Sequence, residues 1–226
     1  MKNIEESKRL HSGEYVEMYE RKPISRIQRL VPLMNLKGGE SLADFACGNA
    51  MLLPLVASKV KHYYGIDFSE DFIKSAIRRA QAEKIKNCSF FCMDIVAFCE
   101  GHRECFDIAT AMDFSEHIDD IDFRHIFSAI YQSLKPGGKL FMHTPDLDFF
   151  IERLKSKGVI RQFPEHIAVR TAAKNIEILG QCGFDKSQIR VWNIAHYNVL
   201  KIFHPLSKLP FIGKLFSARL FIECTK

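Results

Sequence analysis

The chain has 226 residues, of which 47% are hydrophobic and 26% are charged. This composition excludes a disordered chain, and the length suffices for one sizeable hydrophobic core. The net charge of +5 is modest and the 32 basic residues are scattered, so a nucleic-acid partner is permitted but not indicated.

The seven cysteines form neither a CxxC pair nor a zinc-ribbon pattern. The first residues, Met1–Glu6, are polar, and the chain contains no apolar run of about 18 residues that would span a bilayer. We therefore expect free thiols in a cytoplasmic protein. We also expect a single domain that comprises residues 1–226.

Residues 1–35 are predicted to form an N-terminal helical cap. Its two helical patterns divide near Pro23, because proline disfavours helix at the preceding residue and starts a helix readily. Strand and helix patterns then alternate along the chain. The predicted strands are 41–46, 62–66, 88–92, 106–111 and 139–143, and the predicted helices between them are 50–59, 69–84 and 123–134.

The C-terminal part departs from this alternation. Residues 147–170 are basic and irregular and are predicted to form a lid, and a helix is expected over 171–182. Two last strands, 188–197 and 218–225, flank an apolar insertion at 201–216. Alternating strands and helices require parallel pairing with right-handed crossovers. We expect a Rossmann-like, doubly wound α/β fold with seven strands, mostly parallel, the last strand antiparallel, and helices on both faces.

Small or acidic residues follow three consecutive predicted strands. The first strand ends in Asp44-Phe45-Ala46-Cys47-Gly48, Asp67 follows the second, and Asp94 follows the third. Gly48 alone could serve only a tight turn, and Asp67 alone could only cap the next helix. Ligands of open α/β sheets bind beyond the carboxyl ends of the strands, so the three positions together favour a nucleotide-like cofactor, with Asp67 accepting ribose hydroxyls.

This pattern resembles class I S-adenosylmethionine-dependent methyltransferases of the ubiquinone-biosynthesis O-methyltransferase type, over roughly residues 20–195. Their loop usually reads D-x-G-x-G-x-G, whereas here Ala46 and Ala50 replace two glycines and only Gly48 remains. The alanines argue against a pyrophosphate dinucleotide, which needs a closer approach of the backbone. The resemblance implies S-adenosylmethionine as the cofactor.

By this resemblance, Asp67 would hold the ribose, and Asp94 would bind the adenine amino group. Gly48 would lie against the methionine moiety. Arg26 would pair with the cofactor's carboxylate, although a solvated helix arginine explains it equally well. The full set of expected cofactor residues is Arg26, Asp44, Ala46, Cys47, Gly48, Asp67, Phe68, Met93, Asp94, Ile95, Met112 and Asp113.

The fourth predicted strand ends in Met112-Asp113-Phe114-Ser115-Glu116-His117. Related methyltransferases carry E-x-x-E-H here, and a later histidine completes a divalent-metal site. The resemblance gives Asp113, Glu116, His117 and His166 as metal ligands, with the shorter Asp113 in place of the first glutamate. The alternative is a metal-free site with a structural or substrate-facing His117. His117 and His166 are also the candidate catalytic bases, and His143 is a further candidate.

We expect an enzyme that methylates a small-molecule acceptor, most simply at oxygen. Residues 204–216 mix leucine, phenylalanine and lysine, which suits an aromatic or lipophilic acceptor or peripheral membrane contact, although a loop packed over the sheet edge also explains them. One alternative is an RNA 2′-O-methyltransferase, which the lack of a dense basic groove opposes. The other is a non-catalytic S-adenosylmethionine-binding protein. The sequence indicates no oligomeric state.

Overall fold

A computed structural model describes residues 13–163, 165–196 and 198–226. It divides into two compact units. The first extends to Thr110 and includes Gln132–Gly138, and the second comprises Ala111–Tyr131 and Lys139–Lys226. The single domain expected from the sequence stays a prediction, and the first 12 residues of the predicted cap lie outside the described residues.

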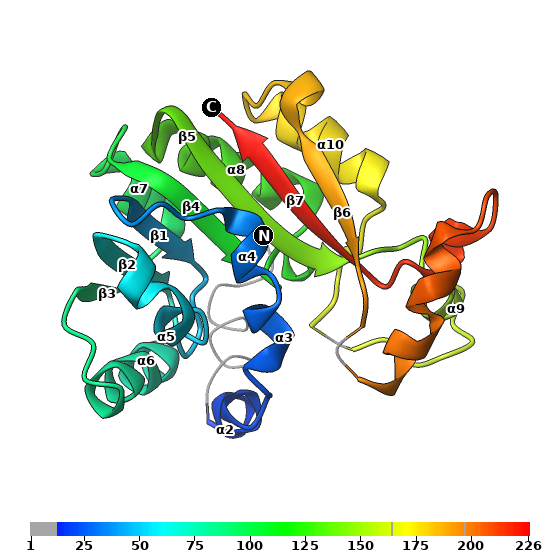
Figure 1. The fold of residues 1–226 in the computed structure, drawn as a ribbon, viewed down its shortest axis with the longest axis horizontal. Coiled ribbons are helices and arrows are strands. Elements are labelled where there is room, and N and C mark those ends of the chain that lie inside the picture. The colour runs from blue at the N-terminus through cyan, green and yellow to red at the C-terminus, as the bar shows by residue number, and fades with distance from the viewer. Residues whose placement is uncertain (1–12, 164, 197) are drawn as a thin grey trace. The chain divides into compact units, whose positions relative to one another are not determined.

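The strands form one seven-stranded sheet in the order β3-β2-β1-β4-β5-β7-β6 (Figure 1). β1 pairs in parallel with β2 and β4, and β2 in parallel with β3. β7 is antiparallel to β5 and to β6. The expected Rossmann-like fold with an antiparallel last strand is confirmed. The strands are β1 Ser41–Phe45, β2 His62–Asp67, β3 Cys88–Cys92, β4 Phe106–Met112, β5 Leu134–Pro145, β6 Arg190–Ile194 and β7 Arg219–Thr225.

Proline shortens the helices of the first unit relative to the prediction. The helix expected after Pro23 is divided into α3 and α4, because Pro32 begins the second of them. The helix expected at 50–59 is only α5 followed by a 3-10 turn, because Pro54 stands in its first turn. The first-unit helices are α2 Glu14–Glu20, α3 Ser25–Gln28, α4 Val31–Met34, α5 Leu53–Val56, η1 Ala57–Lys59, α6 Glu70–Ala82 and α7 Ile95–Glu100, where η denotes a 3-10 helix.

Capping side chains define where two of these helices begin. Ser69 accepts a hydrogen bond from the Phe72 amide and starts α6, whose buried face carries Phe72, Ile73 and Ala76. The sequence analysis placed no helix after the third strand, yet Asp94 caps α7 there. Six residues are too few to show a helical period, so α7 depends on its cap and on the burial of Phe98.

The second unit contains two helical segments that the sequence analysis did not assign as helix. The expected lid, 147–170, is not irregular throughout, because α9 occupies part of it. The apolar insertion at 201–216 is folded into two 3-10 helices, η4 and η5, and η4 begins slightly earlier. Figure 1 shows this segment beside α9. Helices in this part are η2 Ser115–His117, α8 Asp120–Ser133, α9 Phe150–Ser156, α10 Ala172–Gln181, η3 Lys186–Gln188, η4 Val199–Lys208 and η5 Gly213–Phe216.

Within the described ranges, every helix is too short or too polar to cross a membrane. The strands instead carry the hydrophobic core. Leu42 and Phe45 of β1 are fully buried in the first unit, and Phe141 of β5 and Phe221 of β7 are fully buried in the second. A sheet buried on both faces needs such continuous apolar strands.

The loop after β1 turns through three residues with left-handed backbone. Gly48 has a φ of 53°, and the two alanines that replace family glycines have similar values, 53° at Ala46 and 52° at Ala50. Glycine adopts this conformation freely, whereas alanine pays about 1–2 kcal/mol for it. Ala46 and Ala50 thus adopt the left-handed backbone conformation that glycine adopts most easily.

Replacing both alanines by glycine should therefore stabilise the protein. For Ala46→Gly with Ala50→Gly we expect the free energy of unfolding to rise by about 1 kcal/mol, since the relieved strain exceeds the extra entropy of the unfolded chain. Urea unfolding measures the change. Ala43→Gly in β1 is the control and should destabilise. Equal destabilisation by the loop double variant and the control would contradict the strain assigned to the loop.

Candidate functional site

Asp44, at the end of β1, joins three strands of the first unit. Its Oδ1 accepts a hydrogen bond from the Thr110 hydroxyl at 2.5 Å, and its Oδ2 accepts one from the Tyr63 hydroxyl at 2.6 Å. Burial raises the pKa of Asp44 from 3.8 to about 6, although both hydroxyls lower it. Sequence analysis did not identify Tyr63 or Thr110 as partners. Asp44 thus holds the base of the β1 loop.

Asp67, at the end of β2, fastens the β1 loop from the other side. Its Oδ2 accepts a hydrogen bond from the Gly48 amide and its Oδ1 accepts one from the Ser69 amide, each at 2.9 Å. The side chain is buried, and each carboxylate oxygen can accept a second hydrogen bond. Asp67 therefore orders the β1 loop.

The other expected cofactor residues of the first unit differ in exposure. Asp94 is exposed, and its Oδ1 accepts from the Val96 and Ala97 amides at the start of α7. Met93 beside it is also exposed, and Ile95 is buried. Asp94 thus caps α7 and is also exposed to solvent after the end of β3.

Cys47 and Arg26 are both buried in the first unit. Burial raises the pKa of the Cys47 thiol well above its ordinary value, so this cysteine packs in the loop as an inert thiol. The guanidinium of Arg26 lies 5.7 Å from the centre of the Tyr19 ring, and Phe68 is half-buried. Arg26 is therefore not the solvated helix arginine that the sequence also allowed.

In the second unit, Asp113 follows Met112 at the end of β4 and has a left-handed φ of 54°. Its Oδ1 lies 2.9 Å from Nδ1 of His143 and accepts a hydrogen bond from Arg219. Nε of Arg219 also donates to Nε2 of His143 at 3.1 Å. These side chains are almost fully buried. His143 is thus engaged through both ring nitrogens, and Arg219 on β7 is a residue that sequence reasoning missed.

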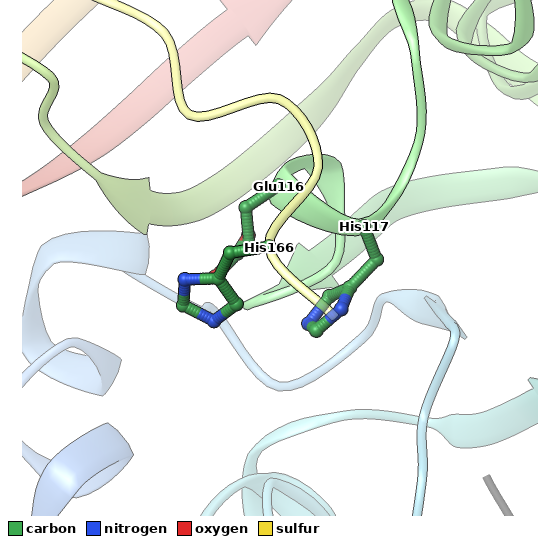
Figure 2. Close-up of side chains that lie close together, drawn as sticks. All are labelled: Glu116, His117 and His166. Atoms are coloured by element: carbon green, nitrogen blue, oxygen red, sulfur yellow. The ribbon is translucent and has the colours of Figure 1, made fainter. Parts of the chain in front are cut away.

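Glu116, His117 and His166 converge in the second unit, as Figure 2 shows. One ligand atom of each lies within 4.8 Å of the others, which suits a metal ion. Among the described residues, Asp113 does not belong to this group, because His143 and Arg219 engage it. The structure thus brings together three of the four residues expected as metal ligands.

The surroundings of His166 leave its imidazole neutral. Nδ1 of the neighbouring His117 lies 2.9 Å from the Glu165 carbonyl oxygen, so the Nδ1–H group of His117 donates to this oxygen. Burial, followed by the nearby charges of His117 and Arg219, lowers the pKa of His166 to about 3. Neutral imidazole is the form that binds metals.

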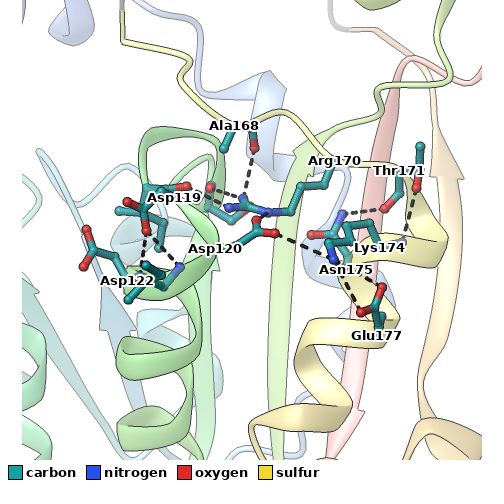
Figure 3. Close-up of polar contacts among 12 residues, drawn as sticks. Asp119, Asp120, Asp122, Ala168, Arg170, Thr171, Lys174, Asn175 and Glu177 are labelled. Atoms are coloured by element: carbon teal, nitrogen blue, oxygen red, sulfur yellow. Dashed lines mark hydrogen bonds and ion pairs between the residues drawn. The ribbon is translucent and has the colours of Figure 1, made fainter. Parts of the chain in front are cut away.

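Arg170 ties the two segments that carry this cluster, as Figure 3 shows. Its guanidinium donates to the carbonyl oxygens of Ser115 at 2.7 Å, Ile118 at 2.8 Å and Ala168 at 3.0 Å, and to the Asp120 carboxylate at 2.8 Å. The residue is only 5% exposed. It therefore holds both sides of Glu116 and His117 in place.

Backbone hydrogen bonds complete the same connection. The amides of Ile167 and Ala168 both donate to the Glu116 carbonyl oxygen, at 2.9 and 3.1 Å. His166 is thereby held next to the loop that carries Glu116 and His117. The sequence analysis did not identify Arg170, because the carbonyl groups of Ser115 and Ile118 to which it donates lie more than 50 residues earlier in the chain.

Comparison with known proteins agrees with this fold. Residues 42–138 match a methyltransferase domain family. A ubiquinone biosynthesis O-methyltransferase from Coxiella burnetii is 31% identical over 124 residues, 55% of this chain and 51% of that protein. Phosphoethanolamine N-methyltransferase 2 from Caenorhabditis elegans is 29% identical over 109 residues, 48% of this chain and 24% of that protein.

A solved structure of an S-adenosylmethionine-dependent methyltransferase from Archaeoglobus fulgidus has a TM-score of 0.66 at 17% identity and covers 99% of both chains. The matched part of this chain spans about half, or less, of the length of the two curated relatives. By its domain match over residues 42–138 and by its fold, the chain is similar to class I S-adenosylmethionine-dependent methyltransferases.

The raised pKa of Asp44 predicts a pH dependence of stability. Between about pH 4 and pH 6 the folded protein holds this proton and the unfolded chain releases it, so the Asp44 contribution to stability falls as the pH rises through this window. In Asp44→Asn this contribution is absent. The difference in unfolding free energy between wild type and variant, from urea titrations at several pH values, should therefore decline from about pH 4 to 6. A difference that is constant across this window would contradict the assignment.

Removing the guanidinium of Arg170 should loosen the cluster. We expect Arg170→Ala to lower the unfolding free energy by about 2–4 kcal/mol, because three carbonyls lose a charged donor. Hydrogen exchange of the Ile167 and Ala168 amides should accelerate as well. Lys174→Ala is the matched control, since Lys174 also faces Asp120, at 3.7 Å, but is exposed. Exchange that is equally fast in wild type and Arg170→Ala would refute the connection.

Proposed function

We propose that this protein is an O-methyltransferase that transfers the methyl group of S-adenosylmethionine to a hydroxyl of a small-molecule acceptor. The observation that carries the proposal is the convergence of Glu116, His117 and His166 beyond the carboxyl end of β4. Carboxylate and neutral imidazole are the groups needed to activate a hydroxyl. We also propose that residues 1–226 act as one methyltransferase domain.

The proposed cofactor site lies around the β1 loop and the ends of β2 and β3. Bound there, S-adenosylmethionine supplies a methyl group on a positively charged sulfur. Asp67 fits the ribose, because two backbone amides fix its carboxylate and a carboxylate oxygen is an acceptor for hydroxyl groups. The proposed set is the one expected from the sequence: Arg26, Asp44, Ala46, Cys47, Gly48, Asp67, Phe68, Met93, Asp94, Ile95, Met112 and Asp113.

Within this set the residues have different tasks. Asp94 would meet the adenine edge, since it is exposed at a strand end beside the exposed Met93. Asp44 would act indirectly, because Thr110 and Tyr63 occupy its oxygens and it shapes the loop. Arg26 would supply a buried positive charge for the cofactor's carboxylate.

The proposed divalent-metal ligands are Glu116, His117 and His166. Their donor atoms fit a cation such as Mg²⁺, Mn²⁺ or Zn²⁺, and the Glu165 carbonyl accepts from Nδ1 of His117, which makes Nε2 the proposed ligand atom. A bound metal would supply Lewis acidity that lowers the pKa of the acceptor hydroxyl. Asp113, also expected as a ligand, is left out of the proposed set because it is paired with Arg219.

The same geometry separates the roles of the two histidines when no metal is bound. His117 presents a lone pair at Nε2 and can accept the proton of the acceptor hydroxyl. His166 stands next to it, with 5.2 Å between the ring centres, and orients it. Since methyl transfer is an in-line displacement, holding the acceptor is the main further requirement.

For the acceptor we propose an aromatic or lipophilic molecule, and peripheral membrane contact through residues 204–216. Exposed apolar side chains in that segment, among them Leu206, Leu209 and Phe211, support this part of the proposal. An RNA 2′-hydroxyl is the second candidate, because Glu116, His117 and His166 suit that acceptor equally well.

The experiment is methyl transfer from radiolabelled S-adenosylmethionine to catechols, quinols, sugars, phosphoethanolamine and short RNAs. We expect labelled methyl ethers from phenolic acceptors. His117→Ala should reduce the rate by about 10²–10⁴-fold, the usual contribution of proton transfer. Asp67→Asn, which loses one acceptor oxygen, should weaken cofactor binding in a calorimetric titration. Transfer to RNA alone would replace the proposal by the second candidate, and cofactor binding without transfer to any acceptor would point to a binding protein.

The metal is tested in the same assay. A chelator should lower the rate, and His166→Ala should lower both the rate and the metal content measured by elemental analysis. His125→Ala is the matched control, because His125 is an exposed histidine of α8. If chelation changes nothing and His166→Ala behaves like the control, the metal is ruled out while O-methylation by His117 stands.

A further inference from the structure

Exposed apolar side chains are unevenly distributed over the described residues. Fourteen large hydrophobic side chains are exposed, and ten of them lie in two stretches of the second unit, four in residues 159–167 and six in residues 199–212. Scattered single exposures need no explanation, whereas a concentration in one short segment marks an interaction site. The six are Val199, Ile202, Leu206, Leu209, Phe211 and Ile212.

Phe211 is the most exposed of the six. It is 103% exposed, and it stands at a left-handed φ of 65° in the turn between η4 and η5. Bulky residues rarely adopt this backbone conformation, and such strain gathers at functional positions. The turn therefore holds an aromatic ring away from the protein at an energetic cost.

The segment is anchored by other aromatic side chains. Phe203 of η4 and Phe216 of η5 lie 5.7 and 6.1 Å from Phe150 of α9, measured between ring centres. Figure 1 shows η4 and η5 beside α9. The internal packing of the segment thus uses Phe150, Phe203 and Phe216, and it leaves the six exposed residues pointing to solvent.

The charges of this segment have one sign. Residues 198–218 contain Lys201, Lys208 and Lys214 and no aspartate or glutamate. All three lysines are exposed. Exposed apolar side chains with lysines around them, in a short amphipathic segment, match the boundary between anionic headgroups and acyl chains.

We propose that this segment is a membrane-docking surface for anionic lipid, composed of the six apolar residues and the three lysines. Phe211 and its apolar neighbours enter the headgroup and acyl boundary, and the lysines meet phosphate groups. The inference extends the contact from 204–216 to Val199, Lys201 and Ile202, and it names the lipid charge. It rests on the membrane contact in the proposed function and deepens it, whereas docking itself does not require methyl transfer.

The test is co-sedimentation of the full chain with vesicles of phosphatidylcholine alone or mixed with phosphatidylglycerol. We expect binding to the mixed vesicles, at least about tenfold weaker binding to phosphatidylcholine, and release at high salt. Phe211→Asp with Ile202→Asp should weaken binding at least about tenfold. Ile121→Asp is the matched control, because Ile121 is 69% exposed and lies in α8, outside this segment. The charge-reversed variant Lys208→Glu with Lys214→Glu should abolish the preference for anionic lipid.

Circular dichroism establishes that each variant folds, and methyl transfer to a water-soluble acceptor should be unchanged in Lys208→Glu with Lys214→Glu. Equal binding of Ile121→Asp and the Phe211 variant would overturn the proposal, as would the absence of binding to either vesicle. Sedimentation equilibrium tests whether a second copy of the chain, instead of lipid, occupies this surface. If the chain forms a dimer that Phe211→Asp dissociates, and does not bind vesicles, then the surface pairs two copies and the lipid proposal is wrong.

Discussion

The candidate catalytic group of Glu116, His117 and His166 depends on the hydrogen bonds that the buried Arg170 guanidinium donates. A charge that is almost fully out of water must be satisfied, and here three backbone carbonyls and the Asp120 carboxylate satisfy it. Its carbonyl partners come from both sides of Glu116 and His117 and from the segment that carries His166. One side chain thus converts two loops into a rigid support for three chemically active groups.

The β1 loop of the first unit follows a similar physical rule with different groups. The β1 loop is held by Asp67, which accepts the Gly48 amide, and by Asp44, which accepts two hydroxyls from neighbouring strands. These buried bonds compensate the left-handed backbone at Ala46 and Ala50. The loop therefore adopts a left-handed backbone at Ala46 and Ala50 because tertiary contacts stabilise it.

The ion-pair partners of Asp113 and Glu116 explain why we propose only Glu116 as a metal ligand. Both acids are buried near Arg219, but Asp113 is also engaged by His143, whereas Glu116 lies 3.6 Å from Arg219 and joins the two histidines. A single arginine thus neutralises part of the negative charge at the end of β4. Glu116, His117 and His166 are the groups that we propose for the chemistry or for a cation.

The sequence by itself predicted the α/β fold. Apolar strands, tight turns and the acids after the strands indicated where the strands end, and Asp67, Asp94 and Glu116 stand at or soon after such ends. Periodicity and turn chemistry are local, so they can be read from neighbouring residues. Only the tertiary structure decided that Arg170 and Arg219 hold the candidate catalytic group and that Asp113 is paired with Arg219. Hydrogen bonds between residues 50 to 106 positions apart leave no local pattern, because they depend on how the chain folds back on itself.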